Sequence, residues 1–570
     1  MHLNDSIATS GLHYICTHHE QAAAMAAEGY ARIANAPGVL NVTTGPGGIN
    51  ALNGVFGAWT DSIPMLILSG QVKRETCMAT YGLTDLRQLG DQEVDIIRMV
   101  KGITKYAVFV SDPDSFAYHL VRAWHLAQNS RPGPCWLDIP VDVQSAQVDP
   151  DTMRHYDPSE DDLQFHPSTV SAHVKDVLDR IARAERPVIF AGSGVRLGNA
   201  LDEFERVIRL LRVPVVTAWT HDLIASDDEL FCGRPGTIGE RAGNFTVQNS
   251  DVLLVLGSRL NIRQTSYNWG SFARFATKIQ VDVDAAELRK PLHQPDVPIH
   301  CDVKVFLAEM ARQLGSSYAP KHDKWLCFAK RWKTKYPVVQ EKQRLPGPPL
   351  NSYDFVDKLF AMLTGDDAVV CGNATACIVP YQAAKLKRGE RLISNSGSAS
   401  MGYDLPAAIG VAVASGKRTI CLAGDGSIQM NVQELSTVVG NHLPVKIFVL
   451  NNNGYLSIRQ TQTGFFQGRK IGESKDSGVT IPSMLKVGEA YGLPSFEIAT
   501  VDDLEIVRRE LDAPGPTLFD VQLDPAQEFE PRLRSKIAPD GKITTPNLED
   551  MYPFLSPEEL AENMLAKEEK

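Results

Sequence analysis

Two polar side chains follow apolar segments in the last third of this 570-residue chain. Asp425 lies in Gly424-Asp425-Gly426, directly after an apolar run at 419–422, and Asn452 follows a second run at 445–450. A carboxylate and an amide oxygen suit Mg²⁺, which takes few protein ligands and completes its shell with phosphate oxygens. Glycines let the backbone approach a diphosphate closely. We therefore expect a metal–diphosphate site, although Gly-Asp-Gly alone also fits an ordinary turn.

The elements around these residues explain how they come together. The two apolar runs fit adjacent parallel strands joined by a helix at 431–439. The carboxyl ends of parallel strands meet at one sheet edge, where ligands bind in open α/β sheets. The spacing therefore places Asp425 and Asn452 side by side.

Strand and helix patterns alternate along the whole chain. The expected fold class is α/β, with three doubly wound parallel-sheet domains at 1–150, 168–330 and 351–570, the last including a C-terminal tail. Polar, proline-bearing joints at 151–166 and 336–352 separate them. Helices are expected at 19–33 and 49–59. Strands are expected at 12–17, 38–44, 64–69, 134–140, 187–191, 214–217, 252–257, 278–283, 368–371, 391–394, 419–422 and 445–450.

Composition excludes several classes of protein. The net charge of −11 argues against a surface built mainly to neutralise nucleic-acid phosphates. No apolar run approaches the ~18 residues of a membrane span, and the first residues lack the features of a signal peptide. Nine scattered cysteines without a Cys-x-x-Cys pair suggest reduced thiols. We expect a cytoplasmic protein with no nucleic-acid or membrane partner.

The Gly-Asp-Gly and Asn-Asn pair, with 24 residues between Gly426 and Asn451, resembles the signature of thiamine diphosphate enzymes. The stretch 397–410 (GSASMGYDLPAAIG) extends the resemblance to their acetolactate synthase branch. The resemblance implies Mg²⁺ ligands at Asp425, Asn452 and the Gly454 carbonyl. It implies that Met401 holds the cofactor bent. The other implied cofactor contacts here are Gly372, Asn373, Ala374, Ala399, Gly424, Gly426, Ser427, Tyr455 and Leu456.

The first block carries the expected catalytic carboxylate. Thiamine diphosphate needs a carboxylate that exchanges a proton with its aminopyrimidine ring. Glu20 opens an Ala-rich helix in the His-Glu-Gln context of that family, although an acidic residue at a helix N-terminus is also ordinary. By the same resemblance, Pro46 and Asn50 line the pyrimidine pocket and Gln92 orients the substrate. A solvated loop residue is the alternative for Gln92.

The middle block resembles the flavin-binding domain of acetolactate synthases. Its Gly-x-Gly is a weak signal alone, but two further segments, 232–236 and 257–265, strengthen the resemblance. FAD is therefore expected, in a structural or vestigial role. Structural turns in a domain without flavin are the alternative. The implied FAD contacts are Gly192, Gly194, Gly233, Gly236, Gly257, Arg259, Arg263, Asp282 and Asp302.

The expected activity is that of a carboligase, which decarboxylates pyruvate and adds the two-carbon unit to a second carbonyl compound. Asp91 and Thr461 stand where the branch places aromatic residues, which opens the alternative of a keto-sugar nucleotide acceptor. Arg459 would then meet a phosphate, or lie on the surface. A pyruvate oxidase-like flavoenzyme is a further alternative.

The resemblance also implies a homodimer or homotetramer in which the Glu20 side of one subunit faces the metal side of another. It leaves a regulatory subunit open. The family has a strand and a Gly-Gly loop before the glutamate, for which the residues preceding Glu20 leave no room. We therefore expect either an upstream start or a first block that lacks one strand.

Overall fold

The computed structural model describes residues 1–161, 167–219, 221–315, 318–344, 347–537 and 543–565. Its contacts group into two compact units. The first unit contains Met1–Leu163, Asp367–Ala376 and Ile393–Leu523, and the second contains Gln164–Asp366, Cys377–Leu392 and Asp524–Lys570. Each unit is described separately below.

The first block of the first unit is a four-stranded parallel sheet in the order β1-β2-β4-β3. All seven residues of β4 are buried, as expected for a parallel strand covered on both faces. Its strands are β1 (Gly38–Val42), β2 (Met65–Gln71), β3 (Tyr106–Phe109) and β4 (Pro134–Pro140). Its helices are α1 (His2–Thr9), α2 (Glu20–Ala34), α3 (Pro46–Asp61), α4 (Met78–Tyr81), α5 (Ile96–Val100), α6 (Phe116–Gln128) and α7 (Val141–Gln144).

The other block of this unit is built on a six-stranded sheet in the order β11-β10-β12-β13-β15-β14. The central strands β12 and β13 are parallel neighbours, with Gly424 opposite Leu450. The strands are β10 (Ala368–Cys371), β11 (Arg391–Ile393), β12 (Thr419–Gly424), β13 (Val445–Asn451), β14 (Ser495–Ile498) and β15 (Thr517–Gln522). The helices that lie wholly in this unit are α17 (Asp404–Ser415), α18 (Leu435–Gly440), α19 (Leu456–Phe465), α20 (Met484–Ala490) and α21 (Leu504–Leu511). Helix α15 (Ser352–Met362) and most of α16 (Thr375–Ala383) belong to the second unit.

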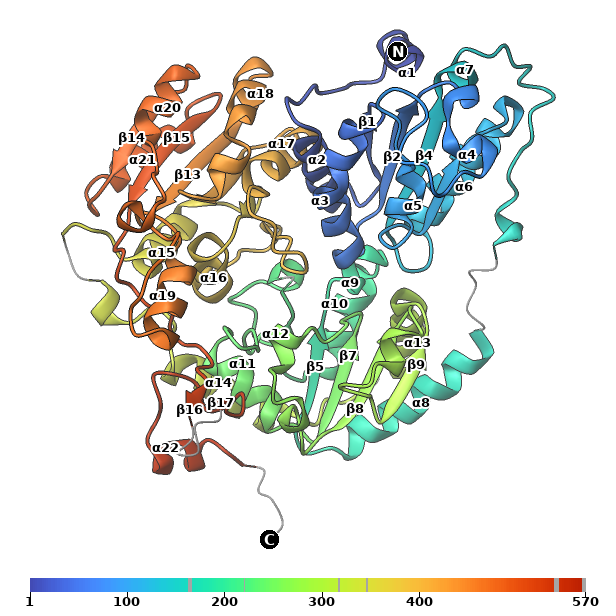
Figure 1. The fold of residues 1–570 in the computed structure, drawn as a ribbon. Helices are drawn as coiled ribbons and strands as arrows, with labels where there is room; N and C mark the ends of the chain where they lie inside the picture. Colours follow the sequence, from blue (N-terminus) through green and yellow to red (C-terminus); the bar gives the residue numbers. More distant parts are fainter. Residues whose placement is uncertain (162–166, 220, 316–317, 345–346, 538–542, 566–570) are drawn as a thin grey trace. The chain divides into compact units, whose positions relative to one another are not determined.

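Helices α2 and α17 join the two blocks of the first unit, and they lie side by side in Figure 1. Both helices are rich in alanine and glycine, so their backbones approach closely. A Cβ atom on Gly29 would overlap the carbonyl oxygen of Ala407, and one on Gly410 would overlap that of Ala26. The contact is therefore backbone against backbone at these points.

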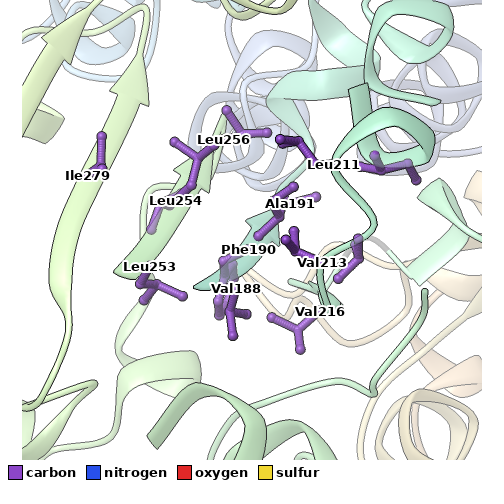
Figure 2. Close-up of a cluster of buried hydrophobic side chains, with 14 of the residues drawn as sticks. Val188, Phe190, Ala191, Leu211, Val213, Val216, Leu253, Leu254, Leu256 and Ile279 are labelled. Carbon is purple, nitrogen blue, oxygen red and sulfur yellow. The ribbon is translucent and has the colours of Figure 1, made fainter. Parts of the chain in front are cut away.

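The second unit contains a five-stranded parallel sheet in the order β6-β5-β7-β8-β9. Figure 2 shows its apolar core, in which side chains of β5 and β7 lie close to Val213 and Val216. The strands are β5 (Pro187–Ala191), β6 (Val215–Thr217), β7 (Val252–Leu256), β8 (Thr277–Asp282) and β9 (Val297–His300). The helices are α8 (Pro167–Arg183), α9 (Gly194–Leu197), α10 (Leu201–Leu211), α11 (Arg241–Gln248), α12 (Ile262–Thr265), α13 (Val303–Leu314) and α14 (Asp323–Lys335).

The C-terminal tail belongs to this second unit and packs on α11. Leu548 and Met551 are fully buried, and Asn244 donates a hydrogen bond to the Leu548 carbonyl (2.9 Å). The tail carries a two-stranded antiparallel ribbon of β16 (Lys536–Ile537) and β17 (Ile543–Thr544), followed by α22 (Pro557–Glu562). The tail is therefore part of the packed structure of this unit.

The predicted fold class is confirmed, since three sheets of parallel strands are flanked by helices. The strand predicted at 12–17 is wrong. This segment has no regular secondary structure, and Leu12 is 66% exposed. The helix predicted at 431–439 is a 3-10 turn at Val432–Glu434 followed by the shorter α18. Residues 162–166 of the first predicted joint and 345–346 of the second lie outside the described residues.

Among the described residues, no helix combines the length and apolar character required to cross a bilayer.

Candidate active site

Asp425 and Asn452 lie at the ends of β12 and β13, as the spacing predicted. The Asp425 carboxylate accepts hydrogen bonds from the backbone N–H groups of Gly426 and Gly454, both at 2.8 Å. Asn452 donates to Thr375 Oγ1 (3.2 Å). Within the described part of the chain, its buried Oδ1 has no hydrogen-bond partner. Buried polar atoms are rarely left unpaired, so this oxygen marks a position where a ligand fits.

The donor set suits a magnesium ion with a diphosphate. Burial raises the pKa of Asp425 to about 6, although the hydrogen bonds from Gly454 and Gly426 and the charge of Arg459 act in the opposite direction. Among the described residues, no cluster of three or more His, Cys, Asp or Glu side chains is arranged for a metal. One carboxylate, one amide oxygen and one carbonyl leave room for phosphate oxygens, as Mg²⁺ requires.

The predicted diphosphate loops converge on this point. Asn373 Nδ2 donates to the Ser400 carbonyl (2.7 Å), and Gly402 N–H donates to Ser427 Oγ (2.8 Å). Ser427 Oγ in turn donates to the buried carboxylate of Asp404 (2.7 Å). A Cβ atom on Gly372 would overlap that same carboxylate. The segments around 372, 400 and 427 therefore form one connected cradle, with the half-buried Met401 within it.

The backbone of this cradle is strained at two non-glycine residues. Ala374 and Ala399 have φ angles of 49° and 55°, a left-handed conformation that alanine rarely adopts. Such strain concentrates at ligand sites. The two alanines are among the residues predicted to contact the cofactor.

The loop after β13 is held by a clamp. Arg459 pairs with Glu473 (2.6 Å) and donates to the carbonyls of Asn452 and Asn453 (3.2 and 2.9 Å). Gly454 lies against Glu473, and the Tyr455 ring lies against Gly426. Leu456 is buried at the start of α19. The expectation that Arg459 lies on the surface is wrong, since its side chain is 13% exposed.

Glu20 is the first residue of α2 and is half-buried. Its Oε2 accepts a hydrogen bond from Asn50 Nδ2 (3.0 Å), and Asn50 lies on α3 one turn after Pro46. Asn53, on the next position of the same helix face, accepts a hydrogen bond from Ser400 Oγ (2.7 Å). The carboxylate side and the diphosphate cradle are thus linked within one chain through α3. The prediction that they come from two subunits stays a prediction.

Gln92 lies in an exposed loop that is held against the Gly45 turn. A Cβ atom on Gly45, whose φ is 58°, would overlap the Gln92 carbonyl oxygen. Gln71 joins the two segments because its Oε1 accepts from Thr44 Oγ1 (2.6 Å) and its Nε2 donates to the Val94 carbonyl (3.1 Å). Gln92 itself has a left-handed φ of 61°. Gln92 thus lies beside the turn predicted to line the pyrimidine pocket, and its role in orienting the substrate stays a prediction.

Asp138 holds the side chain of Gln71 in place. This buried carboxylate accepts hydrogen bonds from Ser69 Oγ (2.6 Å) and Gln71 Nε2 (3.0 Å). Burial raises the pKa of Asp138 from 3.8 to about 7. The folded state therefore favours the neutral acid, so its stabilising contribution is complete below about pH 4 and is lost as the pH rises through about 7.

We expect Asp138→Asn to reduce the loss of thermal stability between pH 5 and pH 8. A shift of about three pKa units corresponds to at most about 4 kcal/mol, and asparagine keeps an uncharged side chain of the same shape. Calorimetry of both proteins at the two pH values measures the effect. An equal loss of melting temperature in wild type and variant would contradict it.

The residues predicted to bind FAD lie at the carboxyl ends of the second unit's strands. Gly192 and Gly194 follow β5 and pack on Gly257 after β7, with Gly194 N–H donating to the Gly257 carbonyl (2.9 Å). Gly236 packs on Arg263, whose carbonyl accepts from Thr237 N–H (2.7 Å). The Gly233 carbonyl accepts a hydrogen bond from the N–H of Thr217 (3.4 Å), the last residue of β6. The glycines therefore join neighbouring loops.

The remaining FAD candidates have structural contacts of their own. Asp302 caps α13 by accepting from Lys304 N–H (2.8 Å), and Asp282 accepts from Asp284 N–H (2.9 Å). The Arg259 carbonyl accepts from Lys290 Nζ. Among the described residues, however, the buried Thr217 Oγ1 and Gln280 Oε1 have no hydrogen-bond partner. Gln280 donates to the Ser258 carbonyl (3.1 Å), so both orphaned atoms adjoin the predicted flavin segments.

Sequence patterns missed the carboxylates that hold the site. Asp404 lies inside the stretch 397–410, Glu434 lies inside the helix predicted at 431–439, and Asp138 lies inside a predicted strand. A charged residue inside an otherwise apolar run, as Asp138 is in PCWLDIP, is a usable signal. Glu434 gave no comparable signal, because its partners His18 and His19 are more than 400 residues away.

Comparison with protein-family models defines the class. Residues 1–99 match the thiamine pyrophosphate enzyme N-terminal TPP binding domain, 174–310 the central domain, and 372–521 the C-terminal TPP binding domain. The chain is therefore a thiamine diphosphate-dependent enzyme.

Curated relatives narrow the class to a family. The chain is 31% identical to a probable acetolactate synthase large subunit of Methanococcus aeolicus, over 95% of this chain and 90% of that protein. It is 30% identical to the acetolactate synthase large subunit of Lactococcus lactis (94% and 89%) and to the isozyme 2 large subunit of Escherichia coli (97% and 95%). It belongs to the acetolactate synthase large-subunit family.

Proposed function

We propose that this enzyme decarboxylates pyruvate and joins the two-carbon unit to a second molecule of pyruvate, forming acetolactate. The observation that carries the proposal is the metal-side site, where Asp425 and Asn452 follow two neighbouring parallel strands and, among the described residues, Asn452 Oδ1 has no hydrogen-bond partner. The relatives named above support the choice of pyruvate as donor.

Different residues of the chain have different roles in the proposed reaction. Thiamine diphosphate, when bound, supplies the carbon that adds to the keto acid and accepts its electrons on loss of CO₂. Asp425, Asn452 and the Gly454 carbonyl hold Mg²⁺, and the glycines at 424 and 426 admit the diphosphate. Glu20, oriented by Asn50, exchanges a proton with the pyrimidine nitrogen. Gln92 orients the keto acid.

A keto-sugar nucleotide is the second candidate acceptor. Asp91 is exposed beside Gln92, and Thr461 is exposed on α19 with its hydroxyl bonded to the Ser457 carbonyl (2.9 Å). Both positions are polar where the branch places aromatic residues. Arg459 does not support a phosphate contact, because Glu473 and two carbonyls already engage its guanidinium.

Product analysis separates these candidates. With thiamine diphosphate, Mg²⁺ and pyruvate alone, we expect acetolactate. If pyruvate is consumed only when a keto-sugar nucleotide is added, the acetolactate proposal fails. Bleaching of a bound flavin by pyruvate would instead identify an oxidase.

We also propose that the second unit binds FAD. The orphaned Thr217 and Gln280 oxygens beside the glycine loops support this proposal, and Arg259 and Arg263 provide guanidinium groups for a pyrophosphate. FAD would be structural, since carboligation has no net redox step. Visible flavin absorbance in the purified protein, retained through gel filtration, tests it. A colourless protein that stays colourless after incubation with FAD contradicts it.

We propose a homodimer or homotetramer in the cytoplasm, with an active site completed by two subunits. Exposed apolar residues on α3 support an association surface: Ile49 is 41% exposed, Phe56 42% and Trp59 38%. A regulatory subunit, which the relatives' designation as large subunits suggests, would be a further partner.

Co-expression of two inactive variants tests the shared site. Glu20→Gln damages the pyrimidine side and Asp425→Asn damages the metal side. If each site takes one side from each subunit, a mixed dimer has one intact site and regains a measurable fraction of the activity. Each variant expressed alone is the control. No recovery from demonstrated mixed dimers would mean that one chain supplies both sides.

A further inference from the structure

Glu434 is a fully buried carboxylate with every bond directed to the segment that leads into α2 or to its own turn. Its Oε1 accepts from the backbone N–H groups of His18 and His19, at 3.0 and 3.1 Å. Its Oε2 accepts from Thr437 Oγ1 (2.6 Å), which fixes the carboxylate in one orientation. Glu434 lies in the 3-10 turn Val432–Glu434, a few residues after Gly-Asp-Gly.

The segment held by Glu434 determines where Glu20 begins its helix. His19 is the N-cap of α2, and its Nδ1 accepts from Gln21 N–H (3.0 Å). Residues 11–17, just before it, have no regular secondary structure, and most of them are exposed. A buried anion close to a helix N-terminus is also stabilised by the positive end of the helix dipole. The bonds to Glu434 are therefore the anchor nearest to Glu20 on its N-terminal side.

The same turn is tied to the diphosphate cradle. Asn431 Nδ2 donates to the Gly402 carbonyl (2.7 Å), and Gly402 N–H donates to Ser427. The turn that carries Glu434 is thus anchored to the cradle. No other described carboxylate bonds to the backbone N–H groups of His18 and His19.

We infer that Glu434 is a positioning residue, which sets Glu20 at the start of α2 by holding the backbone of His18 and His19. It is not a catalytic residue, because it is completely buried and both oxygens are engaged within the chain. This inference rests on the proposed role of Glu20.

Three variants separate hydrogen bonding from charge. Glu434→Ala removes both acceptors. Glu434→Gln keeps an oxygen for the two N–H groups and places an amide against Thr437, whose hydroxyl rotates to accept. Thr437→Val keeps the carboxylate but removes the hydroxyl that orients it. Glu489→Gln, at an exposed glutamate on α20, is the matched control.

The first readout is hydrogen–deuterium exchange of the peptide covering residues 12–21 in the full-length, cofactor-free chain. We expect faster exchange in Glu434→Ala, an intermediate effect in Thr437→Val, and wild-type exchange in Glu434→Gln and Glu489→Gln. Unchanged exchange in Glu434→Ala would overturn the inference. If that variant does not fold, wild-type exchange in Thr437→Val would overturn it instead.

The second readout is turnover with saturating cofactor. We expect Glu434→Ala to lower kcat about 10- to 100-fold, as misplaced catalytic groups do, with the KM for pyruvate changed little. Glu434→Gln should restore kcat to near the wild-type value. A Glu434→Gln enzyme as slow as the alanine variant, with normal exchange, would show that charge and not position matters. Failure of the proposed function is distinguishable, because the Glu489→Gln control would then also form no acetolactate.

Discussion

Glu20→Gln is expected to lower turnover by about 10²- to 10⁴-fold, the range for loss of a general acid–base group. The amide keeps the size of the side chain, and its oxygen still accepts the bond from Asn50 Nδ2. It cannot exchange a proton at the pyrimidine nitrogen. Steady-state kinetics at saturating thiamine diphosphate and Mg²⁺ measure the loss.

Two further measurements make this expectation specific to the proton transfer. Cofactor affinity should stay within a few fold of the wild-type value, because the metal-side loops are untouched. Asn50→Ala keeps the carboxylate but removes its orientation, so its loss of turnover should be smaller. Turnover of Glu20→Gln within tenfold of wild type would remove Glu20 from the mechanism.

Asp425→Asn is expected to weaken Mg²⁺-dependent binding of thiamine diphosphate by at least ~10- to 100-fold, the loss seen when residues that merely orient metal ligands are changed. The substitution removes the one carboxylate among the proposed ligands. Titration of the cofactor-free protein at fixed Mg²⁺ measures it. Asp502→Asn, at an exposed aspartate of the same unit, should bind normally.

Asn452→Ala provides a cleaner test of the same site. Asp425 also holds the N–H groups of Gly426 and Gly454, so its replacement disturbs the loop as well as the metal. Within the described chain, Asn452 Oδ1 has no hydrogen-bond partner, so the substitution loses only the bond from Nδ2 to Thr375 Oγ1 and should lower the melting temperature only slightly. Unaltered cofactor affinity in this variant would exclude Asn452 as a metal ligand.

The sequence was sufficient for the elements whose residues interact locally. The strands around Gly424 and Leu450 were predicted from continuous apolar runs, and their alignment followed from the connection between them. The helix of Glu20 was predicted from its alanines. A strand that is buried on both faces is apolar along its whole length, and a helix that is buried on one side is apolar along one stripe. In each case the pattern lies within the element itself and can be identified from its own residues.

The sequence was insufficient where distant residues decide the structure. The run at 12–17 has the composition of a strand, but it pairs with no sheet, and the backbone just after it bonds to the Glu434 carboxylate instead. Arg459 has the residue type of a surface cation, but in the structure it forms an ion pair with Glu473. Both outcomes depend on partners that no local pattern contains.

The glycine contact between α2 and α17 has a consequence for biosynthesis. Roughly 370 residues separate these helices in the chain, and a ribosome adds about 5–20 residues per second. The first helix therefore emerges about 20–70 s before the second exists, and most of the second unit is made in between. During translation, the nascent N-terminal block presents an unpaired small-residue surface, which makes its early folding a natural point for chaperone assistance.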